Sequence, residues 1–368
     1  MTKKVIAIIS VLKPVDDTRN YEKIARSINN TNKYEVNIIG FSAKKIPTQT
    51  NIKFHPAFTF GRTSIKRSVA SLTIFKILLK VKPELVIVTC AELLIVSIVN
   101  KILFGCKIIY DIQENYYRNI LFTSSYPGFI KYALALIARS IEVLSYPFIN
   151  RYILAENVYL TQLKYTISKA IVIENKALIP ENVRNMKVRK NKELTFVYSG
   201  TIAEHYGIFD AIKFISRLKS STNHVKLIII GFAPQRKIYQ KVSAIVARLN
   251  YITIIGGDAL VAHDQILMEM KKADFCLLPY QKNKSTTGRI PTKLYECLAM
   301  EKPVIITPNQ AWNDIIVQNN AGIIFDLSSN SLFDTQQLYH QYYGNNLSRN
   351  YDWDNSSYKL LEIINELI

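Results

Sequence analysis

The chain has 368 residues, 49% of them apolar, with 12 Gly and 12 Pro. This length favours two domains, and the composition excludes an all-β or a disordered protein. The net charge of +19 is uneven, because residues 1–190 hold 29 Lys and Arg against 12 Asp and Glu. The basic first half predicts an anionic partner, which is nucleic acid, an anionic membrane surface or a phosphate-bearing substrate.

The first half alternates apolar runs with helical patterns. The runs predict strands at residues 4–11, 35–41, 85–89, 107–112, 151–155 and 170–174. The helical patterns predict helices at residues 19–29, 64–80, 91–103 and 128–144. Uniform Val/Ile runs between helices indicate a parallel sheet covered on both faces.

A polar, basic stretch at residues 180–192 is interpreted as an interdomain linker, after which the alternation restarts. Strands are predicted at residues 194–198, 225–230, 252–255, 275–279, 304–307 and 322–325. Helices are predicted at residues 208–218, 237–249, 265–272, 293–300 and 311–318, and an amphipathic helix at 356–368. We therefore predict an α/β protein of two doubly wound Rossmann-like domains that face each other across a cleft.

Targeting, membrane and cysteine signals are weak. The apolar run that follows the first lysines is short and is better explained as a strand than as a signal peptide. No segment reaches the roughly 18 uncharged apolar residues that span a bilayer. The four cysteines lack metal-ligand spacing and lie in apolar runs, so we expect buried, reduced thiols in a cytoplasmic protein.

Ligands of open α/β sheets bind beyond the carboxyl ends of the strands, so the loops after strands are candidate sites. One such loop follows the strand at 194–198 and contains Gly200, His205 and Gly207. Its glycines allow close backbone approach, and the next helix offers its N-terminus to an anion such as a diphosphate. His205 either donates to a phosphate or is a solvated loop histidine.

The second candidate is TTGRIPTKLYECLAM, residues 286–300, where a loop becomes a helix. Lys293 and Glu296 are three residues apart and so share a face of that helix. A carboxylate there accepts two hydrogen bonds from a vicinal diol such as a ribose, while Arg289 and Lys293 neutralise a diphosphate. The alternative is an ordinary surface Lys–Glu pair.

This stretch resembles the signature of family 4 of the nucleotide-sugar glycosyltransferases, which have the GT-B fold. The matching residues are Pro291-Thr292-Lys293-Leu294-Tyr295-Glu296 and then Lys302-Pro303-Val304-Ile305-Ile306. Looser matches are Tyr198-Ser199-Gly200-Thr201, Ala273-Asp274-Phe275, Tyr110-Asp111-Ile112-Gln113-Glu114 and Asp17-Thr18-Arg19. The resemblance covers nearly the whole chain and is most specific at residues 291–306.

The resemblance implies a retaining, metal-independent hexosyl- or N-acetylhexosaminyl-transferase whose donor substrate is a UDP- or GDP-sugar. It implies an acceptor domain at 1–185, a donor domain at 186–345 and a tail at 346–368 that returns to the first domain. The implied catalytic residues are His205, Arg289, Lys293 and Glu296, with Glu296 on the ribose hydroxyls. The implied donor contacts are Ser199, Gly200, Thr201, Gly207, Gly288, Ile290, Pro291 and Thr292. The implied acceptor-side residues are Asp17, Arg19, Gln113 and Glu114.

Three features depart from the family pattern. The Arg and Lys that usually follow the first donor loop are not evident, and His205 and Tyr206 stand near there. Gly288 stands where the family has the first Glu of a pair, the carboxylate that binds the donor sugar. Gln113 stands where the acceptor-domain motif has a His. Recognition of the donor sugar therefore stays open. Asp352-Trp353-Asp354 matches a metal-binding Asp-x-Asp of another transferase fold, but helix capping explains it better.

The basic first half interleaves cations with apolar residues. Examples are Lys44, Lys45, Lys53, Arg62, Lys66, Arg67, Lys76 and Lys80, with aromatics such as Tyr117, Phe129 and Tyr132 further on. This pattern suits a membrane headgroup region, and no nucleic-acid-binding motif accompanies it. We therefore expect a peripheral protein on the inner face of the cell membrane that binds an anionic surface and no nucleic acid.

The predicted function is transfer of a sugar to a glycan acceptor, polyprenyl-linked, in bacterial surface polysaccharide synthesis, such as lipopolysaccharide or capsule. Two alternatives stay open. One is a nucleotide-sugar 2-epimerase of the same fold. The other is a non-catalytic, membrane-bound subunit of a glycan-assembly complex.

Overall fold

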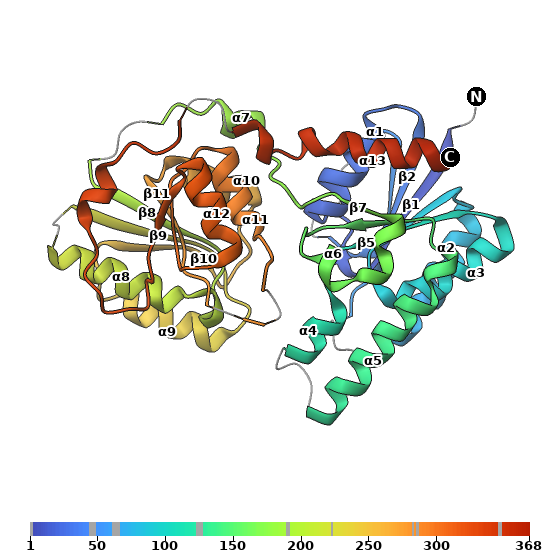
Figure 1. The fold of residues 1–368 in the computed structure, drawn as a ribbon, viewed down its shortest axis with the longest axis horizontal. Coiled ribbons are helices and arrows are strands. Elements are labelled where there is room, and N and C mark those ends of the chain that lie inside the picture. Colours follow the sequence, from blue (N-terminus) through green and yellow to red (C-terminus); the bar gives the residue numbers. More distant parts are fainter. Residues whose placement is uncertain are drawn as a thin grey trace. The chain divides into compact units, whose positions relative to one another are not determined.

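The computed structural model describes residues 3–43, 49–60, 67–122, 128–188, 192–221, 224–281, 283–284, 287–344 and 348–368 (Figure 1). The chain forms two compact units. One comprises Met1–Asn175 with Ser356–Ile368, and the other comprises Lys176–Asn355.

The first unit has a seven-stranded parallel sheet in the order β3-β2-β1-β4-β5-β6-β7. Its strands are β1 (Lys4–Pro14), β2 (Tyr34–Phe41), β3 (Ile52–Phe58), β4 (Leu85–Val88), β5 (Lys107–Ile112), β6 (Arg151–Leu154) and β7 (Ala170–Val172). The sequence analysis missed β3, an edge strand that contains Pro56 and buries only its two end residues. Proline is tolerated at a sheet edge because one side of the strand needs no ladder hydrogen bonds.

The helices of the first unit differ from prediction mainly near their ends. They are α1 (Arg26–Asn29), α2 (Arg67–Val81), α3 (Leu94–Phe104), α4 (Tyr116–Phe122), α5 (Gly128–Leu144), α6 (Tyr159–Gln162) and most of α13 (Asp354–Leu367). The helix predicted at 19–29 begins as a π-helical segment, Thr18–Ala25, before α1. Asp17 caps it by accepting hydrogen bonds from the backbone N–H groups of Arg19 and Asn20. The sequence analysis did not predict α4 or α6.

The C-terminal helix α13 belongs to the first unit from Ser356 onward. Its Asn365 accepts a hydrogen bond from Tyr34 of β2 at 2.9 Å, and its Glu366 pairs with Arg151 of β6 at 3.0 Å. Leu360, Ile363 and Ile364 supply the buried stripe of this amphipathic helix.

The second unit has a six-stranded parallel sheet in the order β10-β9-β8-β11-β12-β13. Its strands are β8 (Leu194–Thr201), β9 (Val225–Phe232), β10 (Ile252–Gly257), β11 (Phe275–Leu278), β12 (Val304–Ile306) and β13 (Gly322–Ile324). Its helices are α7 (Glu181–Arg184), α8 (Ile208–Ser221), α9 (Arg236–Val246), α10 (His263–Lys272), α11 (Thr292–Ala299) and α12 (Gln310–Asn319).

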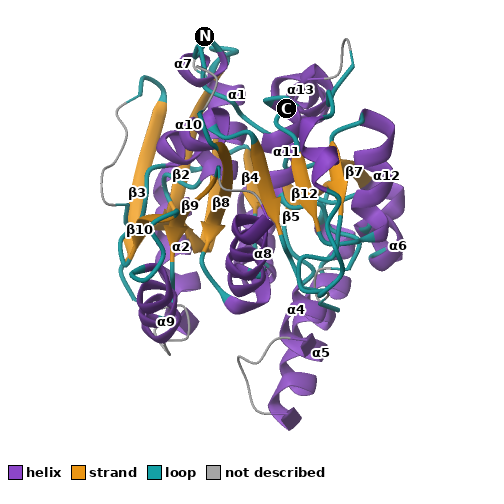
Figure 2. Ribbon diagram, turned by 90° about the vertical axis from the view of Figure 1, so that its left-hand side faces the viewer, coloured by secondary structure: helices purple, strands orange, loops and turns teal. Residues whose placement is uncertain are grey.

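Alternate residues of β8 enter two different apolar clusters, one on each face of this sheet. Phe196 and Tyr198 pack in one cluster, and Val197 packs in the other. Helices accordingly lie on both sides of the strands (Figure 2). The uniformly apolar strands of the sequence follow from this arrangement, because both faces are buried.

The interdomain-linker interpretation of residues 180–192 is wrong for its first part. Ala177, Ile179 and Val183 are buried in a core cluster of the second unit. Arg184 of α7 forms a bidentate pair with Asp352 at 3.0 and 3.1 Å. The boundary between the two units therefore falls after Asn175 rather than at the expected residue 185. The reason is that these three apolar side chains pack into the core of the second unit.

The structure also bears on the predictions about the cysteines and about membrane-spanning helices. All four cysteines are buried and free, as expected. Across the described parts of the chain, no helix has both the length and the apolar composition that crossing a membrane requires.

Candidate active site

The loops that follow β8 and β11 lie against each other at the carboxyl edge of the second sheet. Gly207 ends the β8 loop with φ of +73°, and a Cβ atom there would lie 1.8 Å from the carbonyl oxygen of Pro279. Gly200 has φ of +105°, and a Cβ atom there would lie 3.4 Å from Cε of Lys293. Glycine is therefore required where these two loops meet.

Helix α11 delivers Lys293 and Glu296 to this edge. Pro291 is its N-cap residue, with extended backbone angles, and the helix begins at Thr292. Nζ of Lys293 donates to Oε2 of Glu296 at 2.7 Å. Nε2 of His263, the first residue of α10, lies 2.9 Å from Oε1 of the same carboxylate.

Glu296 is 2% exposed, and its surroundings keep it ionised. Burial acts to raise its pKa, but Lys293 and His263 outweigh burial and hold the pKa at about 2. Each carboxylate oxygen has two lone pairs, and each accepts one of these bonds. The group thus keeps acceptor capacity for the hydroxyls of a ligand.

Sequence reasoning missed His263. It lies 33 residues before Glu296, and the helix that carries it was predicted to begin at residue 265. No local spacing signals the contact, since only the packing of α10 beside α11 brings the ring to the carboxylate.

An aromatic cluster ties the loops of His205 and Arg289 together. The ring of Tyr280 lies 5.1 Å from that of Tyr206 and 5.6 Å from that of Trp312. Nε1 of Trp312 donates to the backbone carbonyl of Arg289 at 2.7 Å. The exposed ring of His205 lies 4.2 Å from Tyr206. The sequence analysis did not identify Tyr280 or Trp312 as supports of the site.

The other expected donor contacts have mixed environments. Ser199 is 7% exposed and its hydroxyl donates to Sδ of Met270, so its side chain is turned inward. Thr201 is exposed, and Gly288 has φ of +79°. Ile290 and Thr292 are half-buried beside the start of α11.

In the first unit, the acceptor-side residues divide into a structural pair and a pocket. Arg19 is 4% exposed and forms a bidentate pair with Asp111 of β5 at 2.9 and 2.7 Å. Gln113 donates to the same Asp111 at 2.9 Å and to Asn20 at 2.8 Å. Asp17 is occupied as a helix cap.

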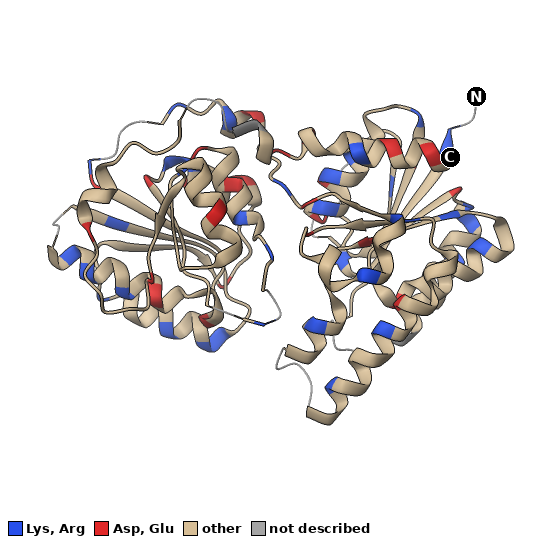
Figure 3. Ribbon diagram, viewed as in Figure 1, with Lys and Arg blue, Asp and Glu red and all other residues tan. Residues whose placement is uncertain are grey.

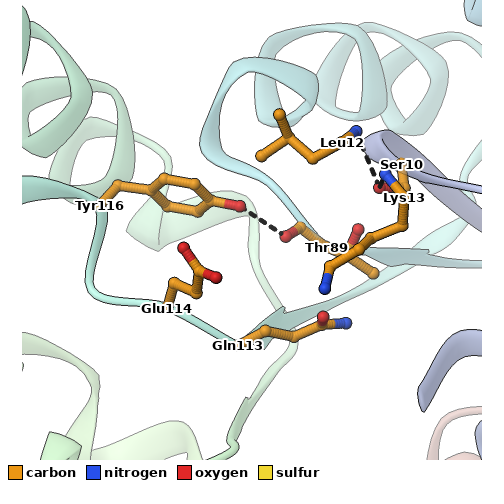
Figure 4. A pocket seen from close by; sticks show the side chains of 7 residues that line it. All are labelled: Ser10, Leu12, Lys13, Thr89, Gln113, Glu114 and Tyr116. Carbon is orange, nitrogen blue, oxygen red and sulfur yellow. Dashed lines mark hydrogen bonds between the residues drawn. The ribbon is translucent and has the colours of Figure 1, made fainter. Parts of the chain in front are cut away.

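A pocket opens at the carboxyl ends of β1, β4 and β5 (Figure 4). It is lined by Ser10, Leu12, Lys13, Thr89, Gln113, Glu114 and Tyr116. Glu114 accepts from Asn119 at 2.6 Å, and the hydroxyl of Tyr116 donates to the carbonyl of Thr89. Gln113 and Glu114 are thus the expected acceptor-side residues that line a pocket. Arg19 and Asp17 are not part of that lining.

Over the described part of the chain, no group of three or more His, Cys, Asp or Glu side chains has metal-binding geometry. Asp352 of the Asp-x-Asp sequence is paired with Arg184, and Asp354 begins α13. Metal independence of the reaction stays a prediction.

Two parallel α/β sheets of seven and six strands define a GT-B-like fold. Solved structures agree with this fold class. Sucrose-phosphate synthase from Thermosynechococcus elongatus superposes with a TM-score of 0.69 at 12% identity, over 99% of both chains. Anabaena HepE in complex with UDP gives 0.62 at 11% identity, over 99% of this chain and 100% of that one. The UDP-GlcNAc 2-epimerase of Methanocaldococcus jannaschii gives 0.59 at 14% identity, over all of both chains.

Residues 181–333 match the family model of the glycosyl transferases group 1. The matched segment contains His263, Arg289, Lys293 and Glu296. No curated protein sequence is detectably similar to the chain.

Proposed function

We propose that the protein is a retaining glycosyltransferase that moves a hexosyl or N-acetylhexosaminyl group from a UDP- or GDP-sugar to a lipid-linked glycan. One observation carries the proposal: an ionised carboxylate, Glu296, is buried and held through both oxygens at the sheet edge where α/β folds bind ligands. A carboxylate fixed in this way can accept hydrogen bonds from the vicinal hydroxyls of a ribose.

The cations around this carboxylate fit the remainder of the donor. Lys293 lies beside Gly200, and the aromatic cluster fixes the backbone of Arg289 and the loop of His205. We propose that these three side chains stabilise the negative charge of a diphosphate as the sugar departs. HepE of Anabaena, whose fold is similar, was solved with UDP and glucose.

In the proposed reaction, an acceptor hydroxyl oxygen bonds to the anomeric carbon as that carbon's bond to the diphosphate oxygen breaks. The hydroxyl proton passes to the departing phosphate, and a nucleoside diphosphate is released. Attack comes on the leaving-group face, so the enzyme supplies no nucleophile. Rate enhancement rests on orientation and on charge stabilisation.

The acceptor is proposed to bind the first unit at the pocket that Gln113 and Glu114 line. The excess of cations in residues 1–190 supports an acceptor anchored in an anionic membrane, on its inner face. The product would be a surface glycan.

A donor screen tests this function. Nucleotide release is measured from a panel of UDP- and GDP-sugars, with and without lipid extract that contains polyprenyl-linked glycans. A transferase releases nucleoside diphosphate rapidly only when acceptor is present. Conversion of the sugar nucleotide to its 2-epimer without acceptor would identify the epimerase alternative. No turnover, from a protein that still binds nucleotide, would identify the non-catalytic subunit.

A further inference from the structure

Helix α5 presents its apolar side chains outward and its carboxylate inward. Phe129, Leu136 and Leu144 are 81%, 58% and 74% exposed. Glu142, in contrast, is 1% exposed, accepts from the hydroxyl of Tyr110 at 2.9 Å and pairs with Arg139 at 3.1 Å. A surface helix that faces water has the opposite arrangement.

Helix α3 repeats this inversion. Ser97 and Asn100 are fully buried, and their side chains are hydrogen-bonded to the carbonyl of Leu93 and to Sγ of Cys106. Ile95 and Ile102 are 57% and 69% exposed. The Ser97 hydroxyl and the Asn100 amide nitrogen therefore bond inside the protein, while Oδ1 of Asn100 is buried without a hydrogen-bond partner among the described residues. These polar side chains face inward, and exposed aliphatic side chains occupy the outer surface of the helix.

The two helices contribute to one surface, because α3 packs against both α2 and α5 (Figure 1). Helix α2 adds Leu72, which is 61% exposed. We call this surface the apolar face, and its most exposed members are Leu72, Ile95, Ile102, Phe129, Leu136 and Leu144. Exposed apolar side chains gathered on adjacent helices in this way are unusual on a monomer and mark an interaction site.

The charges around the apolar face indicate what covers it. Among the residues of α2, α3 and α5, Glu142 is the one carboxylate, and it is buried. Lys76 and Lys80 are exposed on α2, and Lys131 is half-exposed on α5. Figure 3 marks the basic and acidic positions along the ribbon. A second copy of the chain would set these cations against each other, whereas an anionic lipid surface is complementary to them.

We propose that the apolar face inserts into the headgroup and upper acyl region of an anionic bilayer, with α3 and α5 lying in the plane of the membrane. This proposal rests on the proposed function in one respect: the enzyme would encounter its lipid-linked acceptor substrate at the membrane surface. The sequence prediction of membrane contact rested on cations at residues 40–80 and on aromatics further on, such as Phe129 and Tyr132, and it did not identify the exposed aliphatic side chains of α3 and α5. Of those cations, Lys44, Lys45, Arg62 and Lys66 lie outside the described residues. Insertion of aliphatic side chains leaves a component of binding that salt does not screen.

Vesicle flotation of the full-length chain tests the proposal. The vesicles are phosphatidylcholine alone or phosphatidylcholine with phosphatidylglycerol, at low and at high salt. The test variant is Ile102→Ser with Leu136→Ser and Leu144→Ser. The matched control is Leu260→Ser with Val317→Ser and Leu332→Ser, which replaces three exposed aliphatic residues of the second unit that are 64%, 70% and 99% exposed.

The wild type and the control should float with the anionic vesicles, and part of this binding should persist at high salt. The test variant should bind at least about tenfold more weakly at both salt concentrations, given the apolar area withdrawn from lipid. Equal flotation of the two triple variants would overturn the proposal, as would failure of the wild type to bind either vesicle. Wild-type self-association that the test substitutions abolish, with no vesicle binding, would assign the face to a second copy.

A second measurement does not depend on a loss of binding. The native tryptophans, Trp312 and Trp353, are both buried in the second unit. A tryptophan introduced as Leu144→Trp should be quenched by acyl-brominated lipid, and one introduced as Leu260→Trp should not. Equal quenching at both positions would contradict insertion.

Flotation also separates this proposal from the proposed function. The Glu296→Ala chain should float like the wild type because the apolar face is unaltered. If the wild type floats but no donor is turned over, the enzymatic proposal fails and the membrane surface stands. If transfer occurs with a soluble acceptor and the chain never floats, the proposed membrane insertion fails and the enzymatic proposal stands.

Discussion

Nζ of Lys293 lies 2.7 Å from Oε2 of Glu296, one turn apart on α11, with both side chains largely withdrawn from solvent. The sequence left two explanations for this pair, a ligand-binding group or a surface ion pair. Burial favours the first, because an exposed pair has little reason to recruit His263 to the second oxygen.

Replacing Glu296 or Lys293 with alanine should abolish transfer while the protein stays folded. The loss of a charged contact to the donor predicts at least a 100-fold fall in kcat/KM, about 3 kcal/mol. Nucleotide release measures this, and circular dichroism confirms folding. Glu269→Ala is the matched control, since Glu269 forms an i,i+3 pair with Lys272 at the same 2.7 Å on α10. Full activity in folded Glu296→Ala would refute the ribose role.

The low pKa of Glu296 predicts a specific dependence of stability on pH. Its pKa is about 2 in the folded state against 4.5 ordinarily, so the folded state binds fewer protons between these values. The stabilisation is therefore complete above about pH 4.5 and is lost as the pH falls towards 2. Between pH 6 and pH 3 this group should remove about 2 kcal/mol from the free energy of unfolding. Urea unfolding of the wild type and Glu296→Gln should show that only the wild type has this component; parallel curves would contradict it.

His263 should act as a positioning residue for Glu296. Replacement by alanine removes one hydrogen bond to a carboxylate, worth about 1.5 kcal/mol, and so should raise KM for the donor about tenfold with a smaller effect on kcat. His263→Gln retains a nitrogen donor and should recover part of the affinity. His340→Ala, at an exposed histidine, is the control. An unchanged KM in His263→Ala would show that the contact has no role in donor binding.

The loop at Gly288 should not tolerate the glutamate that the glycosyltransferase family has at this position. Its φ of +79° costs a residue with a side chain about 1–2 kcal/mol. Gly288→Glu should therefore lower the melting temperature and leave transfer no faster, whereas Gly288→Asn, which tolerates this conformation, should melt near the wild type. A more active and equally stable Gly288→Glu would show that the loop adapts.

Because the Arg19–Asp111 ion pair is buried in the first unit, we expect that removing one partner lowers the free energy of unfolding strongly. Asp111→Ala leaves a buried guanidinium without its carboxylate and should destabilise by about 3–5 kcal/mol. The double variant Arg19→Met with Asp111→Leu should recover much of that loss. Denaturant unfolding of the single and double variants measures both terms. Gln113 also loses a partner, so KM for the acceptor should rise in Asp111→Ala.

Much of the fold was predictable from local pattern. Val/Ile runs separated by amphipathic stretches predicted twelve of the thirteen strands that the structure describes, and helix α5 at residues 128–144 was predicted with its observed bounds. The edge strand β3 was missed because it depends on β2 for its hydrogen bonds rather than on its own apolar residues. Residues 180–183 were assigned to a linker at 180–192 because Val183 is an isolated apolar residue there and carries no periodic signal.

For the candidate site, the sequence by itself determined which residue types stand together on α11, because an i,i+3 spacing fixes a shared helix face. It also determined the alternation that makes two parallel sheets. Only the tertiary structure decided that Glu296 is buried and bonded to His263, and that α3 and α5 turn their apolar sides outward. Those features depend on which helix packs beside which. The sequence pattern of an amphipathic helix is the same whether its apolar stripe faces the protein core or lipid.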